Sequence, residues 1–214
     1  MKRYILTAGI SSALLLSACS GPSTEEQLDA VLKDTFDAES DYRDTQSQME
    51  ELESSEQEKF ESIMALTQEQ QEDVRTNAEE ALASVDERLE LLETEKASID
   101  SAEEVFQEID TVIEETEEED LKSDLTALKT TMNERFDAHE QFAAVYEELA
   151  AEQKELYELL LNEETELQVL QEKTVTVNDK NQEVQNAVTA FNEQTEQFNE
   201  MKNNLIEKMN ADNE

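Results

Sequence analysis

Four consecutive residues near the amino terminus have the types and order needed for covalent attachment of a lipid: Leu16, Ser17, Ala18 and Cys19. A cysteine thiol can take up a diacylglyceryl group, and small side chains before it suit cleavage by a signal peptidase. Upstream lie Lys2, Arg3 and an apolar run of about a dozen residues, which is the layout of a secretory signal. This run is too short to span a bilayer as a helix. We therefore predict a signal peptide over residues 1–18 that ends in a lipobox.

The cysteine supports this interpretation. Cys19 is the only cysteine in the chain, so it has no partner for an intrachain disulfide. The alternative is an ordinary secretory signal with a cysteine that happens to lie near the cleavage point. Two acyl chains on Cys19 would anchor the protein stably, since each buried CH₂ contributes roughly 0.8 kcal/mol. We expect residues 19–23 to form a short tether at the outer face of the cytoplasmic membrane.

The charge of the chain excludes one class of function. The sequence has 16 basic and 56 acidic residues, and loss of Lys2 and Arg3 with the signal leaves a formal charge of −42. Nucleic-acid binding is excluded, because phosphates demand a basic surface. Two explanations of the excess of acidic residues are left open: a surface adapted to a salty environment, and cation binding. Acid-rich chains can be disordered, but 37% of the residues are hydrophobic and they recur periodically, which favours a folded domain.

Residues 24–214 are predicted to form one helical domain. Neither Gly nor Pro occurs after Pro22, although sheets and tight hairpins depend on such turn residues. Strong helix formers such as Glu, Gln, Leu and Ala dominate instead. Apolar residues follow a stripe of near-heptad period, for example at Val85, Leu89 and Leu92. We therefore expect an all-α fold: an elongated antiparallel bundle or coiled coil of three to five long helices.

Candidate caps and breaks divide this domain. The first helix is expected to begin at Ser23 or Thr24, since Thr24 and Gln27 have the spacing of a capping box. Turns are expected near residues 66–68, 114–120 and 173–179. Thr116 is the expected N-cap after the second turn, and β-branched residues weaken the helix at the third. A second capping-box pattern begins at Ser101, but the apolar stripe keeps its phase there, which favours a continuous helix.

No arrangement of residues typical of catalysis is present. His139 is the only histidine, so the paired histidines of a zinc-protease helix are missing, and we expect His139 at the surface or boundary of a helix. The acidic run 114–120 lacks the glycine and spacing of a calcium loop, although cation binding there is an alternative. Phe and Met at helical spacing are expected in the core, whereas Tyr42, Tyr146 and Tyr157 are either boundary residues or contacts for a partner. We predict no enzyme activity, no metal site and no cofactor.

The lipobox and the long Glu- and Gln-rich helical stretch after it also suggest a family. In these features the chain resembles the YkyA-like lipoproteins of Gram-positive bacteria, a family described as cell-wall-binding. The resemblance extends over nearly the whole chain, and its specific motif is the lipobox from Leu16 to Cys19. It implies a helical, membrane-tethered envelope protein and supplies no catalytic residues.

The main functional hypothesis is a membrane-anchored extracellular lipoprotein that serves as a non-enzymatic helical spacer or binding module in the cell envelope. Its partners would be the membrane, through the lipid on Cys19, and peptidoglycan or an envelope protein. The alternatives are a solute- or cation-binding lipoprotein and an adaptor or inhibitor of a cell-wall enzyme. The stretch from Val177 to Met209 is the best candidate surface, since its many Asn and Gln residues can hydrogen-bond neutral sugars or peptides. The oligomeric state is left open.

Overall fold

The computed structural model describes residues 21–66 and 70–212, and this part of the chain is helical throughout its regular structure. It contains six α-helices and no β-strand: α1 (Thr24–Ala38), α2 (Ser40–Ala65), α3 (Gln71–Phe106), α4 (Ile109–Glu115), α5 (Glu119–Leu161) and α6 (Leu167–Asp212). The prediction of an all-α, elongated bundle is confirmed. The predicted lipobox and Cys19 lie outside the described residues.

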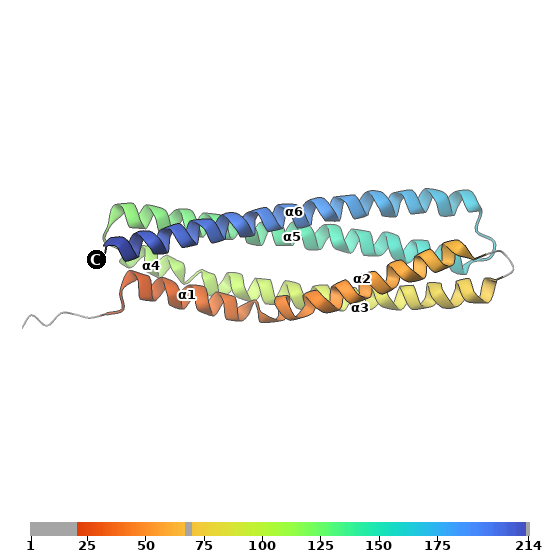
Figure 1. The fold of residues 1–214 in the computed structure, drawn as a ribbon, viewed down its shortest axis with the longest axis horizontal. Helices are drawn as coiled ribbons and strands as arrows, with labels where there is room; N and C mark the ends of the chain where they lie inside the picture. Colours follow the sequence, from red (N-terminus) through yellow and green to blue (C-terminus); the bar gives the residue numbers. More distant parts are fainter. Residues whose placement is uncertain (1–20, 67–69, 213–214) are drawn as a thin grey trace, which may run out of the picture.

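The helices form four long arms that run alternately in opposite directions (Figure 1). α1 and α2 make the first arm, α3 and α4 the second, and α5 and α6 the third and fourth. The closest packing is between α5 and α6, between α2 and α3, and between α3 and α5. Thr24 and Asp212 lie at one end of the bundle, whereas the loops that follow α2 and α5 lie at the other (Figure 1).

The first helix begins at Thr24, within the predicted start at Ser23 or Thr24, but its capping box is built on Ser23 and Glu26 instead of Thr24 and Gln27. Ser23 is the N-cap: its hydroxyl accepts from the Glu26 backbone N–H at 3.2 Å, and the Glu26 carboxylate accepts from the Ser23 backbone N–H at 2.8 Å. This reciprocal pair satisfies two backbone donors that the helix itself leaves free. The described part of the chain therefore starts with a well-defined helix end directly after the predicted tether.

Two predicted turns are found, but one predicted cap is wrong. α2 ends at Ala65 and α3 begins at Gln71, close to the expected turn, although residues 67–69 lie outside the described chain. The second turn lies between α4 and α5, as expected. Thr116, however, ends α4 instead of starting α5, because its hydroxyl donates to the Val112 carbonyl at 2.7 Å.

The third predicted turn, near residues 173–179, is wrong. α6 runs unbroken through it, and the Thr174 hydroxyl is satisfied within the helix by donating to the Leu170 carbonyl at 2.8 Å. Val177 is buried in the core, which offsets the lower helix propensity of a β-branched residue. The turn lies at residues 162–166 instead, where the Asn162 side chain accepts from the Glu164 backbone N–H at 3.1 Å.

The first arm breaks at Glu39, which the apolar pattern does not predict. Glu39 is buried, and both of its carboxylate oxygens accept hydrogen bonds from the Arg135 guanidinium of α5. The Arg135 Nε also donates to the Thr195 hydroxyl of α6 at 3.0 Å. A bidentate pair of this kind is stronger than a single hydrogen bond and also fixes the relative orientation of its partners. Through Arg135 the break at Glu39 is linked to α5 and α6, so it connects three arms of the bundle. By contrast, α3 is continuous past Ser101, as predicted.

All four arms close around one core at the end that holds α1 and α4. Leu28 of α1 and Leu205 of α6 belong to the same buried cluster. Phe106 lies edge to face against Phe198, with ring centroids 6.2 Å apart. The prediction that helically spaced Phe and Met residues are core is wrong in two described places: Phe36 is 56% exposed and Met64 is 64% exposed.

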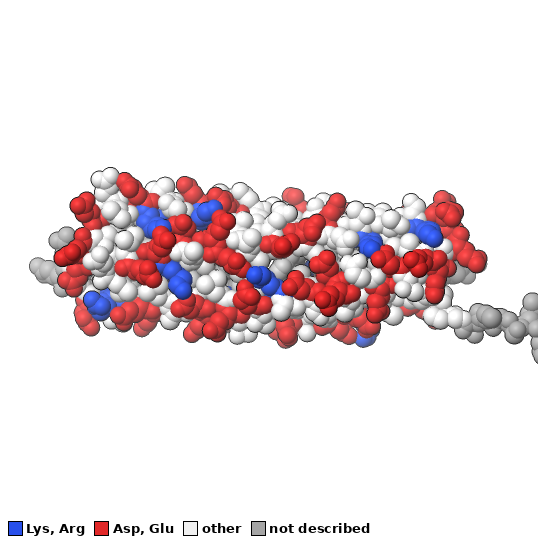
Figure 2. Space-filling model, turned by 180° about the vertical axis from the view of Figure 1, so that it is seen from behind, with Lys and Arg blue, Asp and Glu red and all other residues white. Residues whose placement is uncertain are grey.

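Acidic side chains cover the face of the bundle seen in Figure 2, with few Lys and Arg residues between them. Mutual repulsion of these carboxylates lowers the stability of a compact bundle. Dissolved salt weakens this repulsion, because the screening length shortens to about 3 Å at 1 M. We therefore expect the melting temperature, followed by circular dichroism, to rise by several degrees between low salt and about 1 M NaCl. A melting temperature that stays constant over this range would contradict the prediction.

Candidate binding groove

A groove of about 960 Å³ runs along the middle of the bundle between α2 and α6. It exists because α2 packs on α3 and α6 packs on α5, while α2 and α6 are not among the closely packed pairs. The floor is therefore supplied by α3 and α5. Apolar floor and wall residues include Met49, Leu149, Val177 and Val184, which belong to one core cluster. The groove is thus backed by packed core.

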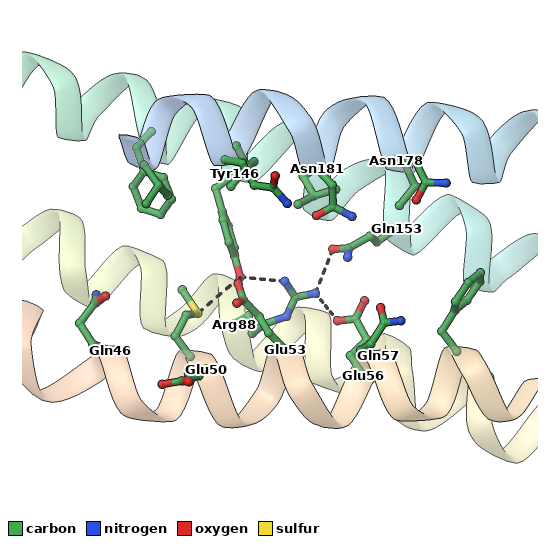
Figure 3. A pocket seen from close by; sticks show the side chains of 18 of the residues that line it. Gln46, Glu50, Glu53, Glu56, Gln57, Arg88, Tyr146, Gln153, Asn178 and Asn181 are labelled. Atoms are coloured by element: carbon green, nitrogen blue, oxygen red, sulfur yellow. Dashed lines mark hydrogen bonds and ion pairs between the residues drawn. The ribbon is translucent and has the colours of Figure 1, made fainter. Parts of the chain in front are cut away.

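Arg88 is the centre of a buried polar network in this groove (Figure 3). Its side chain, only 1% exposed, forms an ion pair with Glu56 of α2. It also donates to the Tyr146 hydroxyl at 2.7 Å and to the Gln153 side-chain oxygen at 2.9 Å, both on α5. The Tyr157 hydroxyl donates to Glu56 at 2.8 Å. Arg88 therefore ties α2, α3 and α5 together beneath the groove.

Burial sets the protonation behaviour of this network. Burial raises the pKa of the Glu56 carboxyl, and this effect exceeds the lowering effects of Arg88 and Tyr157. Burial alone would lower the pKa of the Arg88 guanidinium, but Tyr146 and Glu56 together raise it, so Arg88 stays charged. Burial likewise raises the pKa of the Tyr146 and Tyr157 hydroxyls, which remain protonated donors. Glu56 consequently depends on Arg88 for its charge to be tolerated.

A second buried pair, His139 and Glu95, lies about two helical turns further along the bundle, since Glu95 is seven residues beyond Arg88 on α3. His139 Nε2 is 2.8 Å from a Glu95 carboxylate oxygen, and the other Glu95 oxygen accepts from the Gln46 side chain at 3.0 Å. His139 is 2% exposed and Glu95 is 1% exposed, so the predicted surface or boundary position of His139 is wrong. Tyr42 and Phe191 lie edge to face against its ring. The histidine is a core residue held by a carboxylate.

The predicted surface from Val177 to Met209 supplies part of the groove wall. Thr174, Asn178, Asn181, Gln185 and Thr189 line the groove, and their spacing of three or four residues places them on one face of α6. Among them Asn178 and Asn181 lie across the groove from α2 (Figure 3). The same helix buries Phe191, Phe198 and Leu205 on its core side. The amide-rich stretch therefore has a polar stripe beside its apolar one.

Sequence reasoning missed the buried network, although its residues follow the heptad period. Four residues of α3, each seven positions apart, are buried to 1% exposure or less: Ala81, Arg88, Glu95 and Ala102. On α5 the same period joins Met132, His139 and Tyr146, all buried. A charged residue on a core heptad position is the pattern that would have found them. Of the three tyrosines, Tyr146 and Tyr157 are buried and Tyr42 is half-buried.

Within residues 21–66 and 70–212, no group of three or more His, Cys, Asp or Glu side chains has a geometry that could hold a metal ion. Among the described helices, none combines the length and the apolar character that crossing a membrane requires.

Comparisons with known proteins identify relatives over most of the chain. A family model described as "Putative cell-wall binding lipoprotein", YkyA, matches residues 23–208. The chain is 26% identical over 195 residues to the uncharacterized lipoprotein YkyA of Bacillus subtilis strain 168, which covers 91% of this chain and 87% of that protein. In structure it is similar to a conserved protein of unknown function from Staphylococcus aureus, with a TM-score of 0.75. That match has 14% sequence identity and covers 88% of this chain and 98% of the other.

Proposed function

Because the chain belongs to the YkyA family of cell-wall-binding lipoproteins, we propose that it is an extracytoplasmic binding module, anchored to the membrane by a lipid on Cys19, that holds a cell-wall polymer in the groove between α2 and α6. The module binds and does not catalyse. The lipobox residues Leu16, Ser17 and Ala18 direct the processing that places it at the outer face of the cytoplasmic membrane.

The single observation that carries this proposal is the groove itself. Its α6 wall offers Asn and Gln side chains, each with both hydrogen-bond donors and an acceptor. Such groups can pair with the hydroxyls and amides of a polar polymer, and they add no charge that would repel anionic groups on it. The apolar floor beneath them supplies the burial that a bound chain needs.

The shape of the groove favours a polymer over a small solute. Sites for small molecules usually enclose most of the ligand surface, whereas this groove is only partly enclosed and lies between two helices that do not pack closely on each other. Its lining begins at Thr174 and ends at Thr189 on α6, about 22 Å at roughly 1.5 Å per residue. An elongated ligand fills such a site better than a compact one. The alternatives of a solute-binding lipoprotein and of an adaptor for a wall enzyme are therefore less favoured.

Wall binding is tested by replacing the amides that line the groove. We expect the triple variant Asn178→Ala, Asn181→Ala and Gln185→Ala to weaken the affinity for isolated cell walls at least about tenfold, since each lost hydrogen bond contributes about 0.5–1.5 kcal/mol. The measurement is a pull-down at several protein concentrations. The variant should remain helical, because alanine is the best helix former.

The matched control changes three exposed amides of α6 outside the groove. Gln182→Ala, Asn186→Ala and Asn192→Ala remove as many amide groups from the same helix, and none of these residues lines the groove. Their combined variant should sediment like the wild-type protein. Equal loss in both triple variants, or no loss in either, would remove the groove from consideration as the wall-binding site.

A further inference from the structure

The two walls of the groove differ in chemistry. Where α6 supplies neutral amides, α2 supplies three carboxylates: Glu50, Glu53 and Glu56. Glu56 is paired with Arg88. Glu53 accepts from the Tyr146 hydroxyl at 2.6 Å through one oxygen, and its other oxygen has no partner in the described chain. Glu50 has no hydrogen bond or ion pair with any described residue.

Cationic side chains do not neutralise this wall. Among the described residues that line the groove, the only cationic ones are Arg43 and Arg88. The Arg43 guanidinium is engaged elsewhere: it donates to the Phe36 carbonyl at 2.6 Å and stacks over the Phe36 ring, 3.7 Å from its centroid. Arg88 is committed to Glu56 beneath the groove. Three carboxylates on α2 therefore face one arginine, Arg88, whose charge is paired with Glu56 and also acts on Glu53, so this wall keeps a net negative charge.

We propose that the groove binds an extended peptide of the cell wall that carries a free primary amine, with its ammonium group held by Glu50 and Glu53. This inference rests on the proposed function and names the ligand class. Glu50 and Glu53 are three residues apart on one helix, so they are neighbours on its surface and can share one cation. On the opposite wall, Asn178 and Asn181 offer the donors and acceptors that pair with main-chain amides.

The dimensions fit such a peptide. The groove length along α6, from Thr174 to Thr189, corresponds to about seven residues of extended chain at roughly 3.3 Å each. Leu149 of the floor, together with Met49 and Val177 of the two walls, gives the groove an apolar lining on which short side chains can pack. In a neutral peptide with one central amine, the ammonium group would contact the acidic wall and the main-chain amides would contact the amide wall. Its short side chains would pack on the apolar lining.

The test compares two capped, fluorescently labelled peptides of seven residues. One has six alanines and a central lysine, and the other is identical except that the lysine amine is acetylated. The lipid-anchored chain is purified in a neutral detergent, and the dissociation constants are measured by fluorescence anisotropy. We expect the acetylated peptide to bind about tenfold more weakly, since two exposed ion pairs are each worth up to about 1 kcal/mol. Equal affinities for the two peptides would overturn the proposal.

Variants of α2 separate the groove from the total charge of the protein. Glu50→Gln with Glu53→Gln should weaken binding of the lysine peptide by about the same factor as acetylation, and leave the acetylated peptide unaffected. Glu51→Gln with Glu58→Gln is the matched control, because both are exposed residues of the same helix outside the groove and the change in charge is equal. Equal weakening by both pairs would show attraction to the acidic surface as a whole and would overturn the proposal.

Wall pull-downs distinguish this inference from the proposed function. Chemical acetylation of the amines of isolated walls should lower binding of the wild-type protein to the level of the Glu50→Gln and Glu53→Gln variant. Wall binding that depends on Asn181 but not on these two carboxylates would overturn the ligand class and leave the proposed function standing. Binding of the lysine peptide without any binding of walls would overturn the proposed function instead.

Discussion

Replacing Arg88 with methionine is expected to lower the free energy of unfolding by about 3–5 kcal/mol, because removal of one partner leaves the other charge of a buried pair uncompensated. Glu56, 3% exposed, would keep its hydrogen bond from Tyr157 but lose its counter-charge. The measurement is urea unfolding followed by circular dichroism. The midpoint should fall by about 2 M, given a slope of roughly 2 kcal/mol per M for a chain of this size.

Two controls make this result specific. Arg75→Met removes an exposed arginine whose pair with Glu79 spans 3.8 Å, and it should change the unfolding free energy by less than about 0.5 kcal/mol. Adding Glu56→Gln to Arg88→Met removes the stranded charge and should recover at least half of the lost stability. A loss below about 1 kcal/mol in the Arg88→Met protein would contradict the network as a buried, tightly coupled unit.

The second large effect concerns the anchor. Cys19→Ala should abolish incorporation of a labelled fatty acid and transfer the protein from the membrane fraction to the medium, or leave it unprocessed. The reason is that two acyl chains supply the anchoring energy, at roughly 0.8 kcal/mol for each buried CH₂. Ser12→Ala, within the apolar part of the predicted signal peptide, is the control and should keep both label and membrane association. Label retained on the Cys19→Ala protein would contradict lipidation at this residue.

Much of the fold follows from local features of the sequence. The absence of Gly and Pro after Pro22 and the near-heptad stripe were enough to predict long helices in an elongated bundle. The acidic run near Thr116 marks a turn because charged residues there avoid the core. The third turn was misplaced because Val177 is buried against the core, and packing of this kind does not show in residue propensities. A single Asn side chain at Asn162 shapes the turn instead.

The groove was beyond sequence reasoning for a different reason. The amide-rich stretch of α6 was recognisable, but its partner wall was not, since Glu50 and Glu53 look like any other acidic residues in a chain with 56 of them. What distinguishes Glu50 and Glu53 is their position across the groove from α6. That position depends on the packing of the four arms against one another, which the sequence pattern does not give. The burial of Arg88 and His139 could have been predicted from their core heptad positions. A charged or polar residue at such a position requires a buried partner.

Both ends of the described chain lie at one end of the bundle (Figure 1), so a lipid on Cys19 would set how far each part of the bundle stands from the membrane. If the lipid is on Cys19, Met49 at the groove lies 25 residues of helix beyond Thr24, about 37 Å at roughly 1.5 Å per residue. The loop at Asn162 stands higher, since α5 alone is 43 residues, about 65 Å. A tether of residues 19–23 adds at most about 17 Å of slack. If the groove binds the wall as proposed, an upright bundle would reach only the layer of wall at this distance from the lipid, and binding would depend on how close that layer lies to the membrane.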